Sequence, residues 1–82
     1  MKLENEKLDH IMHEVYKELK KAMTYHESMF DAHQGYAIIL EELDEAWFEI
    51  KCNDKKRTRE EMLQVAAMAL RFLHDVSDKG KS

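Results

Sequence analysis

The chain has 82 residues, of which 44% are apolar and 37% are charged, and its formal net charge at pH 7 is −4. This length permits one small domain, and the acidic balance argues against binding to a nucleic acid polymer, which requires a basic surface. Proline is absent and glycine occurs twice, while Ala, Leu, Met, Glu and Lys are abundant. This composition predicts an all-α fold.

The sequence also indicates a compartment. Cys52 is the single cysteine, so no internal disulfide is expected and a reducing environment is the default. No apolar run approaches the roughly 20 residues of a membrane span. The first ten residues, MKLENEKLDH, alternate charge with leucine and lack the apolar centre of a signal peptide. We therefore expect a cytoplasmic protein that does not associate with membranes.

The first predicted helix covers about residues 4–25, because its apolar side chains recur at three- and four-residue steps. A break follows at HESMFDAHQG. Asp31 is a good N-cap for the next helix, and Gln34 stands three residues later, as in a capping box. Gly35 falls in the first turns of that helix, where it costs roughly 1 kcal/mol relative to alanine. Either close packing or the approach of a ligand would offset this cost.

The second predicted helix covers residues 32–52 and carries two different faces. One face is apolar, and the other bears glutamates at three- and four-residue steps (Glu41, Glu42, Glu45 and Glu49). Neighbouring like charges on a helix cost a few tenths of a kcal/mol per pair. Such a face is either simply solvated or stabilised by a cation bound among the carboxylates.

A short polar linker, residues 53–56, predicts that a third helix returns antiparallel to the second. Thr58 and Glu61 fit a capping box, so we expect this helix over residues 59–77, followed by a frayed end from Ser77 to Ser82. Glu61 then has an alternative role as the partner of the Thr58 cap. Three wide apolar stripes in so short a chain predict exposed apolar surface, and hence a homo-oligomeric helical bundle, a dimer or a tetramer.

Helices that run antiparallel in this way would bring Glu41-Glu42-x-x-Glu45 close to Glu61-x-x-Gln64. Each half places polar side chains one turn apart on one helical face. Mg²⁺ prefers oxygen ligands and usually keeps several waters, so a few carboxylates and a substrate phosphate would complete its shell. A metal there would neutralise developing charge and lower the pKa of a bound water.

The strings Glu41-Glu42-x-x-Glu45 and Glu61-x-x-Gln64 resemble the bipartite acidic signature of the MazG-like all-α nucleotide pyrophosphohydrolases. That signature is EExxE, followed after a spacer by ExxD. The longer strings HQGYAIILEELDEAWFEIK and REEMLQVAAMALRFLHDV are also similar to short MazG-like proteins. The resemblance covers about residues 31–76. It implies an all-α NTP pyrophosphatase-like fold and the hydrolysis of a nucleoside triphosphate to a monophosphate and pyrophosphate.

The resemblance further implies Mg²⁺ (or Mn²⁺) as cofactor, with water attacking the α-phosphate. The implied metal ligands are Glu41, Glu42, Glu45, Glu61 and Gln64. One carboxylate, with Glu42 and Glu45 as the catalytic candidates, would instead orient or deprotonate the attacking water. Gln64 stands where the family has aspartate, which removes a charge from the site. Glu60 or Asp75 would be a substitute for that charge.

Other residues are candidates for substrate binding. His33 and Gln34 open the second helix, where backbone N–H groups and the helix dipole favour anions; capping and solvation are the alternative for both. Arg71 is a candidate for a phosphate contact, and solvation is its alternative. Trp47 and Tyr36 favour a core or a subunit interface over stacking on a base. A different class of function, a non-catalytic helical oligomer or nucleotide-binding module with a degenerate metal site, fits the same sequence.

Overall fold

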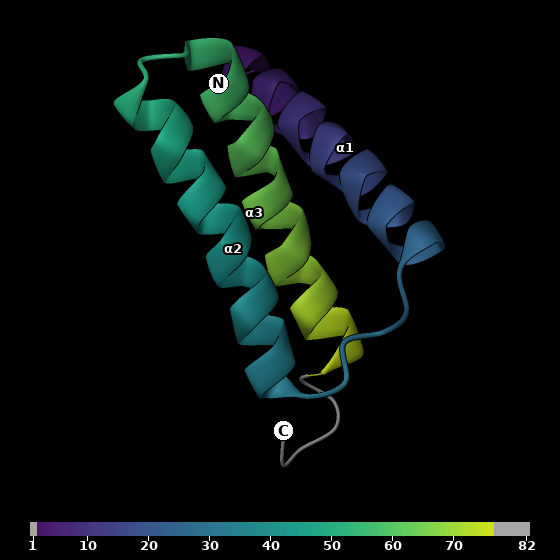
Figure 1. The fold of residues 1–82 in the computed structure, drawn as a ribbon. Helices are drawn as coiled ribbons and strands as arrows, with labels where there is room; N and C mark the ends of the chain where they lie inside the picture. The colour runs from purple at the N-terminus through teal and green to yellow at the C-terminus, as the bar shows by residue number, and fades with distance from the viewer. Residues whose placement is uncertain (1, 77–82) are drawn as a thin grey trace.

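The computed structural model describes residues 2–76, and over this range the chain consists of three α-helices and no strand (Figure 1). The helices are α1 (Lys2–Tyr25), α2 (Ala32–Lys51) and α3 (Lys55–Asp75). The all-α prediction is therefore confirmed. The expected frayed end, Ser77 to Ser82, lies outside the described residues. None of these three helices combines the length and the apolarity needed to cross a bilayer, as far as the described residues extend.

Helix α3 lies between the other two helices and packs against both (Figure 1). A short turn joins it to α2, so the two run antiparallel, as the polar linker predicts. The segment of residues 26–31 connects the end of α1 to the start of α2. This arrangement places α1 and α2 on different sides of α3.

The start of α2 confirms the capping prediction. Asp31 has an extended backbone, and its Oδ1 accepts a hydrogen bond from the backbone N–H of Gln34 at 2.9 Å. The side-chain Oε1 of Gln34 reaches back and accepts from the N–H of Phe30. This is one residue earlier than in a standard capping box, and it joins the connecting segment to the helix that follows.

The start of α3 differs from the prediction: the helix begins at Lys55, and its cap is Asp54 rather than Thr58. Asp54 Oδ1 accepts from the N–H of Arg57 at 2.9 Å. Asn53 has a φ of 58°, and its N–H donates to Ile50 O while that of Asp54 donates to Glu49 O. This pair of bonds is the Schellman motif. The left-handed Asn53 ends α2 and leaves Asp54 free to start α3 at once.

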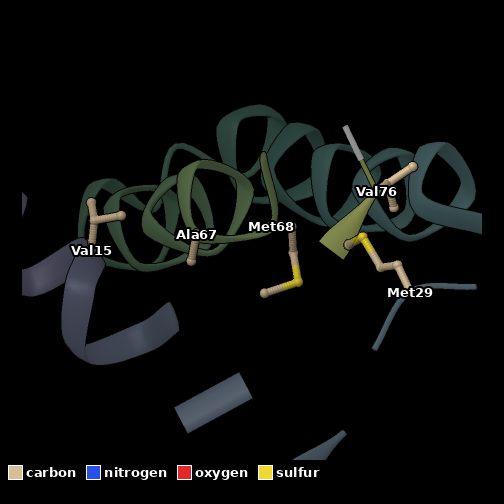
Figure 2. Close-up of a cluster of buried hydrophobic side chains, with 5 residues drawn as sticks. All are labelled: Val15, Met29, Ala67, Met68 and Val76. Atoms are coloured by element: carbon tan, nitrogen blue, oxygen red, sulfur yellow. The ribbon is translucent and has the colours of Figure 1, made fainter. Parts of the chain in front are cut away.

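The buried apolar core is small (Figure 2). Its members come from all three helices and from the connecting segment: Val15, Met29, Ala46, Ala67, Met68 and Val76. Among the residues described, no Leu, Ile, Phe, Tyr or Trp side chain is classed as buried. The large apolar side chains therefore lie at the edges of the core or in solvent.

Gly35 is one of the two α2 residues that are buried. A Cβ at this position would lie 2.5 Å from Cδ2 of Phe72 and 3.2 Å from Sδ of Met29. The first distance is shorter than real Cβ contacts, and the second is tighter than most of them. Close packing of α2 against α3 therefore accounts for the glycine in the first turns of the helix.

Candidate functional site

The structure brings together three of the predicted acidic residues. Glu42 and Glu45 lie one turn apart on α2, and Glu61 faces them from α3. One carboxylate oxygen from each lies within 4.8 Å of the other two. The three-residue spacing on α2 and the antiparallel turn produce this arrangement. Three hard oxygen atoms at this separation are able to share a cation or a proton.

Repulsion and burial both act on this acidic cluster, which we define as Glu42, Glu45 and Glu61. Burial raises the pKa of Glu42, and the charges of Glu45, Glu61 and Glu41 raise it further. Burial likewise raises the pKa of Glu61, followed by a hydrogen bond with Glu45 and by the charges around it. Glu42 and Glu61 therefore keep a proton to higher pH than ordinary surface glutamates do.

Glu61 carries the least satisfied oxygen of the cluster. Its Oε2 is buried and has no hydrogen-bond partner. The alternative role of this side chain, as the partner of a Thr58 cap, does not apply because Asp54 caps α3. A buried acceptor without a partner is uncommon, so an ion, a proton or a water molecule at this oxygen would stabilise the protein.

A groove of about 950 Å³ adjoins the cluster, within the size range of small-molecule sites. Its walls come from the end of α1, the connecting segment, the first half of α2 and the second half of α3. Glu41 and Glu42 line it on α2, and Glu42 is the member of the cluster that also belongs to the groove. The other polar or aromatic residues of the wall include Glu18, Lys21, Tyr25, Phe30, Gln34, Gln64 and Arg71.

Gln64 lines this groove but lies outside the acidic cluster. Its side-chain Nε2 donates a hydrogen bond to Oε1 of Glu18 on α1. The amide is therefore held by α1, and its predicted role as a metal ligand remains a prediction.

Arg71 is buried, with 5% of its surface exposed, so the alternative of a solvated arginine is wrong. One guanidinium nitrogen donates to the backbone O of Glu27 at 2.6 Å, and Nε lies 3.6 Å from Oδ2 of Asp75. That carboxylate oxygen also accepts from the N–H of Met29 at 3.0 Å. Arg71 and Asp75 thus fix the connecting segment, while Arg71 still lines the groove. Asp75 is engaged here and does not join the acidic cluster.

Of the other residues predicted from the sequence, one lines the groove and three do not. Gln34 lines the groove and caps Phe30, whereas His33 is exposed and does not line it. Tyr36 and Trp47 are exposed as well, at 65% and 55%, and neither lines the groove. They are not core residues.

Sequence reasoning missed the contribution of α1 to the groove, which consists of Glu18, Lys21 and Tyr25. These residues carry no motif, and their spacing is that of an ordinary charged helix. No local sequence signal indicates that α1 forms part of this groove.

No protein-family model, curated protein or solved structure matches this chain. The MazG-like resemblance therefore remains a prediction from the residues themselves.

The acidic cluster and the groove beside it carry side chains of opposite charge. The acidic cluster presents hard oxygen atoms next to a groove whose wall also contains Lys21 and Arg71. Carboxylates bind divalent cations, and basic side chains bind phosphate oxygens. Both basic side chains have acidic neighbours, since Lys21 Nζ lies 3.5 Å from Oε1 of Glu18 and Arg71 Nε lies 3.6 Å from Oδ2 of Asp75.

Proposed function

We propose that this protein is a Mg²⁺-dependent nucleoside triphosphate pyrophosphohydrolase, which releases pyrophosphate and a nucleoside monophosphate. The observation that carries the proposal is the double position of Glu42, which belongs both to the acidic cluster and to the groove wall. A cation held at the cluster would therefore meet a ligand lying in the groove. The MazG-like resemblance supports the same reaction.

The residues of the cluster fit such a cation. Glu42, Glu45 and Glu61 would hold it through carboxylate oxygens, the donors that Mg²⁺ and Mn²⁺ prefer. The unpartnered Oε2 of Glu61 and the raised pKa values of Glu42 and Glu61 support this assignment, because a bound cation would offset both the missing partner and the repulsion. When bound, the ion would neutralise phosphate charge and lower the pKa of a bound water.

The side chains of the groove have separate tasks in this proposal. Glu41, or Glu42 where it does not hold the cation, orients the attacking water and accepts its proton. The water oxygen bonds to the α-phosphorus as the bond to the bridging oxygen breaks, and pyrophosphate leaves with the electron pair. Lys21 and Arg71, which line the groove from α1 and α3, provide positive charge for the phosphates.

The test is pyrophosphate release from a panel of ribo- and deoxyribonucleoside triphosphates, with Mg²⁺, Mn²⁺ or EDTA. Two variants of adjacent exposed residues on α2, Glu45→Ala and Asp44→Ala, form a matched pair because only Glu45 belongs to the cluster. We expect metal-dependent release that Glu45→Ala lowers at least 10-fold and Asp44→Ala leaves unchanged, since loss of a side chain that supports a bound metal costs about 10–100-fold. Equal rates in the two variants would contradict the proposal.

A non-catalytic helical module is the second candidate, and the bond between Gln64 and Glu18 favours it. Gln64 is neutral where the MazG-like signature has aspartate, and its bond to Glu18 joins the amide to α1, outside the acidic cluster. This protein would then bind nucleotides without hydrolysing them. Titration of a fluorescent nucleoside triphosphate analogue distinguishes the candidates: saturable binding with no pyrophosphate release favours the module.

A further inference from the structure

The turn between α2 and α3 carries a concentration of positive charge. Five of the nine residues from 51 to 59 are basic and one is acidic, in a chain whose formal net charge is −4. All five basic residues are exposed. We name them the basic tip: Lys51, Lys55, Lys56, Arg57 and Arg59. Positive charge is therefore gathered at one end of an acidic molecule (Figure 1).

The basic tip does not stabilise the helix that it begins. Lys55, Lys56 and Arg57 form the first turn of α3, which contains no acidic residue. The positive end of a helix dipole favours acidic side chains there and disfavours basic ones. Asp54 offsets part of this charge, since its Oδ2 lies 3.7 Å from Nε of Arg57. Lys55 and Lys56 form no ion pair within the part of the chain that the structure describes.

A mostly apolar pocket of about 500 Å³ lies beside the basic tip. Its apolar side chains are Ile50 from α2 and Met62 from α3, which are 40% and 42% exposed. The other residues of its wall are Asn53, Lys55, Thr58 and Arg59. Lysine and arginine line apolar surfaces with their aliphatic stems while their charged ends stay in solvent. The pocket thus combines apolar side chains with positively charged ends.

Arg59 holds one side of this pocket in place. Its two terminal nitrogens donate to the two carboxylate oxygens of Glu14 on α1, at 2.9 and 2.6 Å. A bidentate pair of this kind fixes the plane of the guanidinium. The charge of Arg59 is therefore compensated within the protein, and Lys55 and Lys56 supply the free positive charge next to the pocket.

We propose that the basic tip and this pocket are the docking site for an acidic peptide segment of a partner protein. One apolar side chain of that segment enters the pocket beside Ile50 and Met62, and carboxylates on either side of it meet Lys55 and Lys56. An apolar anchor in a pocket supplies most of the affinity of such a contact, while complementary charge supplies specificity and speed of association.

Other anionic partners fit this surface less well. Protein contacts to a nucleic acid backbone go to phosphate and sugar, which offer no aliphatic side chain for the pocket. An anionic membrane binds an amphipathic helix that lies flat with its apolar face buried, whereas the basic tip is the point at which two helices end. No residue lines both this pocket and the groove. The inference therefore goes beyond the proposed function and does not depend on it.

The test is a selection of short random peptides, displayed on phage, against the folded wild-type protein. We expect the enriched peptides to carry Asp or Glu on both sides of one Leu, Ile, Met or Phe. A synthetic copy should bind with an affinity that falls at least 10-fold between about 50 and about 500 mM NaCl, because salt screens exposed charge. A selection that enriches no peptide, or only neutral or basic ones, would overturn the proposal, and so would binding of single-stranded RNA or phosphatidylserine vesicles in place of any acidic peptide.

A matched pair of double variants locates the site. Lys55→Glu with Lys56→Glu reverses charge at the basic tip, whereas Lys17→Glu with Lys20→Glu makes the same change at exposed α1 residues outside it. The first pair is not expected to unfold α3, since acidic residues favour the start of a helix, and circular dichroism checks this. We expect the first pair to weaken binding of the synthetic peptide at least about 10-fold and the second less than about 2-fold. Equal affinities in the two pairs would contradict the proposal.

A second change separates the pocket from the charge. A peptide with serine in place of the apolar residue should bind wild type at least about 10-fold more weakly, because it loses the anchor. Met62→Gln should weaken binding of the original peptide and leave that of the serine peptide unchanged. A serine peptide that binds as tightly as the original would show that the pocket takes no part.

Discussion

Asp75 accepts a hydrogen bond from the backbone of Met29, a residue 46 positions earlier in the chain, at 3.0 Å. The same carboxylate lies 3.6 Å from Nε of Arg71 and 2.7 Å from Nδ1 of His74. Burial alone would raise the pKa of Asp75, but the bonds from His74 and Met29 and the charge of Arg71 outweigh it and hold that pKa below its usual value of 3.8. One carboxylate thus ties the segment between α1 and α2 to the end of α3.

Asp75→Asn should therefore destabilise the fold by about 3 kcal/mol or more, because it leaves the buried Arg71 without its counter-ion. An ionised Asp75 stabilises the folded state at pH values above 3.8, and this contribution is lost as the pH falls through the lowered folded pKa. The gap between wild type and variant should accordingly be widest at neutral pH and narrow under acid. Urea unfolding at several pH values measures it. Asp44→Asn, at an exposed position on α2, is the control and should show no such gap.

The observed cap of α3 gives a second prediction. Asp54→Ala should cost about 1 kcal/mol, because the N–H of Arg57 loses its acceptor. Thr58→Ala should cost much less, since Thr58 lies inside the first turns of the helix and its backbone N–H already donates to Asp54 O. Thermal unfolding of the two variants compares them directly. The reverse order of stability would mean that α3 begins at residue 59 after all.

Gly35→Ala should destabilise the protein although alanine is the better helix former. The new Cβ would meet Phe72 at 2.5 Å, and overpacking of this kind costs about 1–3 kcal/mol, which exceeds the gain of up to about 1 kcal/mol in helix propensity. Phe72→Leu should relieve the clash, so the two substitutions together should cost less than their sum. Additive effects in this double-mutant cycle would show that the contact does not limit the choice of residue.

Helical periodicity predicted the parts of the fold that depend on local spacing. The apolar stripes gave the three helices, and the short linker gave the antiparallel pair. The start of α3 was misplaced because both Asp54 and Thr58 are good caps, and sequence alone does not choose between them. The left-handed Asn53 selects Asp54 as the cap, because Asn53 ends α2 immediately before that residue.

The candidate site likewise has a part that local spacing predicts and a part that it does not. The convergence of Glu42, Glu45 and Glu61 follows from a three-residue step and an antiparallel turn, so it was predictable. The wall formed by Glu18 was not, because the position of α1 depends on contacts between distant residues. The bonds of Asp75 and Arg71 to the connecting segment span more than 40 positions, and no local pattern marks them.

The acidic cluster should make the metal-free protein less stable as the pH rises. The pKa values of Glu42 and Glu61 are raised above 4.5, so protonation favours the folded state, and this stabilisation is lost as the pH rises through the raised values. Glu61→Gln removes one ionising group and should raise metal-free stability at pH 7 by a few tenths of a kcal/mol to about 1 kcal/mol. The advantage should vanish below pH 4.5. Glu6→Gln, on the exposed side of α1, should give no pH-dependent gain.

Gln64→Asp tests whether the site is complete as it stands. The new carboxylate would lose the hydrogen bond to Glu18 and face it as a like charge, so metal-free stability should fall by about 1 kcal/mol or more. Added Mg²⁺ should restore stability if the aspartate binds the ion, because a ligand that binds only the folded state stabilises it. Thermal unfolding with and without Mg²⁺ measures both effects.

The double variant Gln64→Asp with Glu18→Gln separates the two causes, since it restores a hydrogen-bond donor opposite the carboxylate and keeps the total charge of wild type. We expect it to recover most of the metal-free stability. If it also hydrolyses nucleoside triphosphates faster than wild type, the natural glutamine weakens a metal site. If wild type is the faster enzyme, Gln64 held by Glu18 is part of a working site.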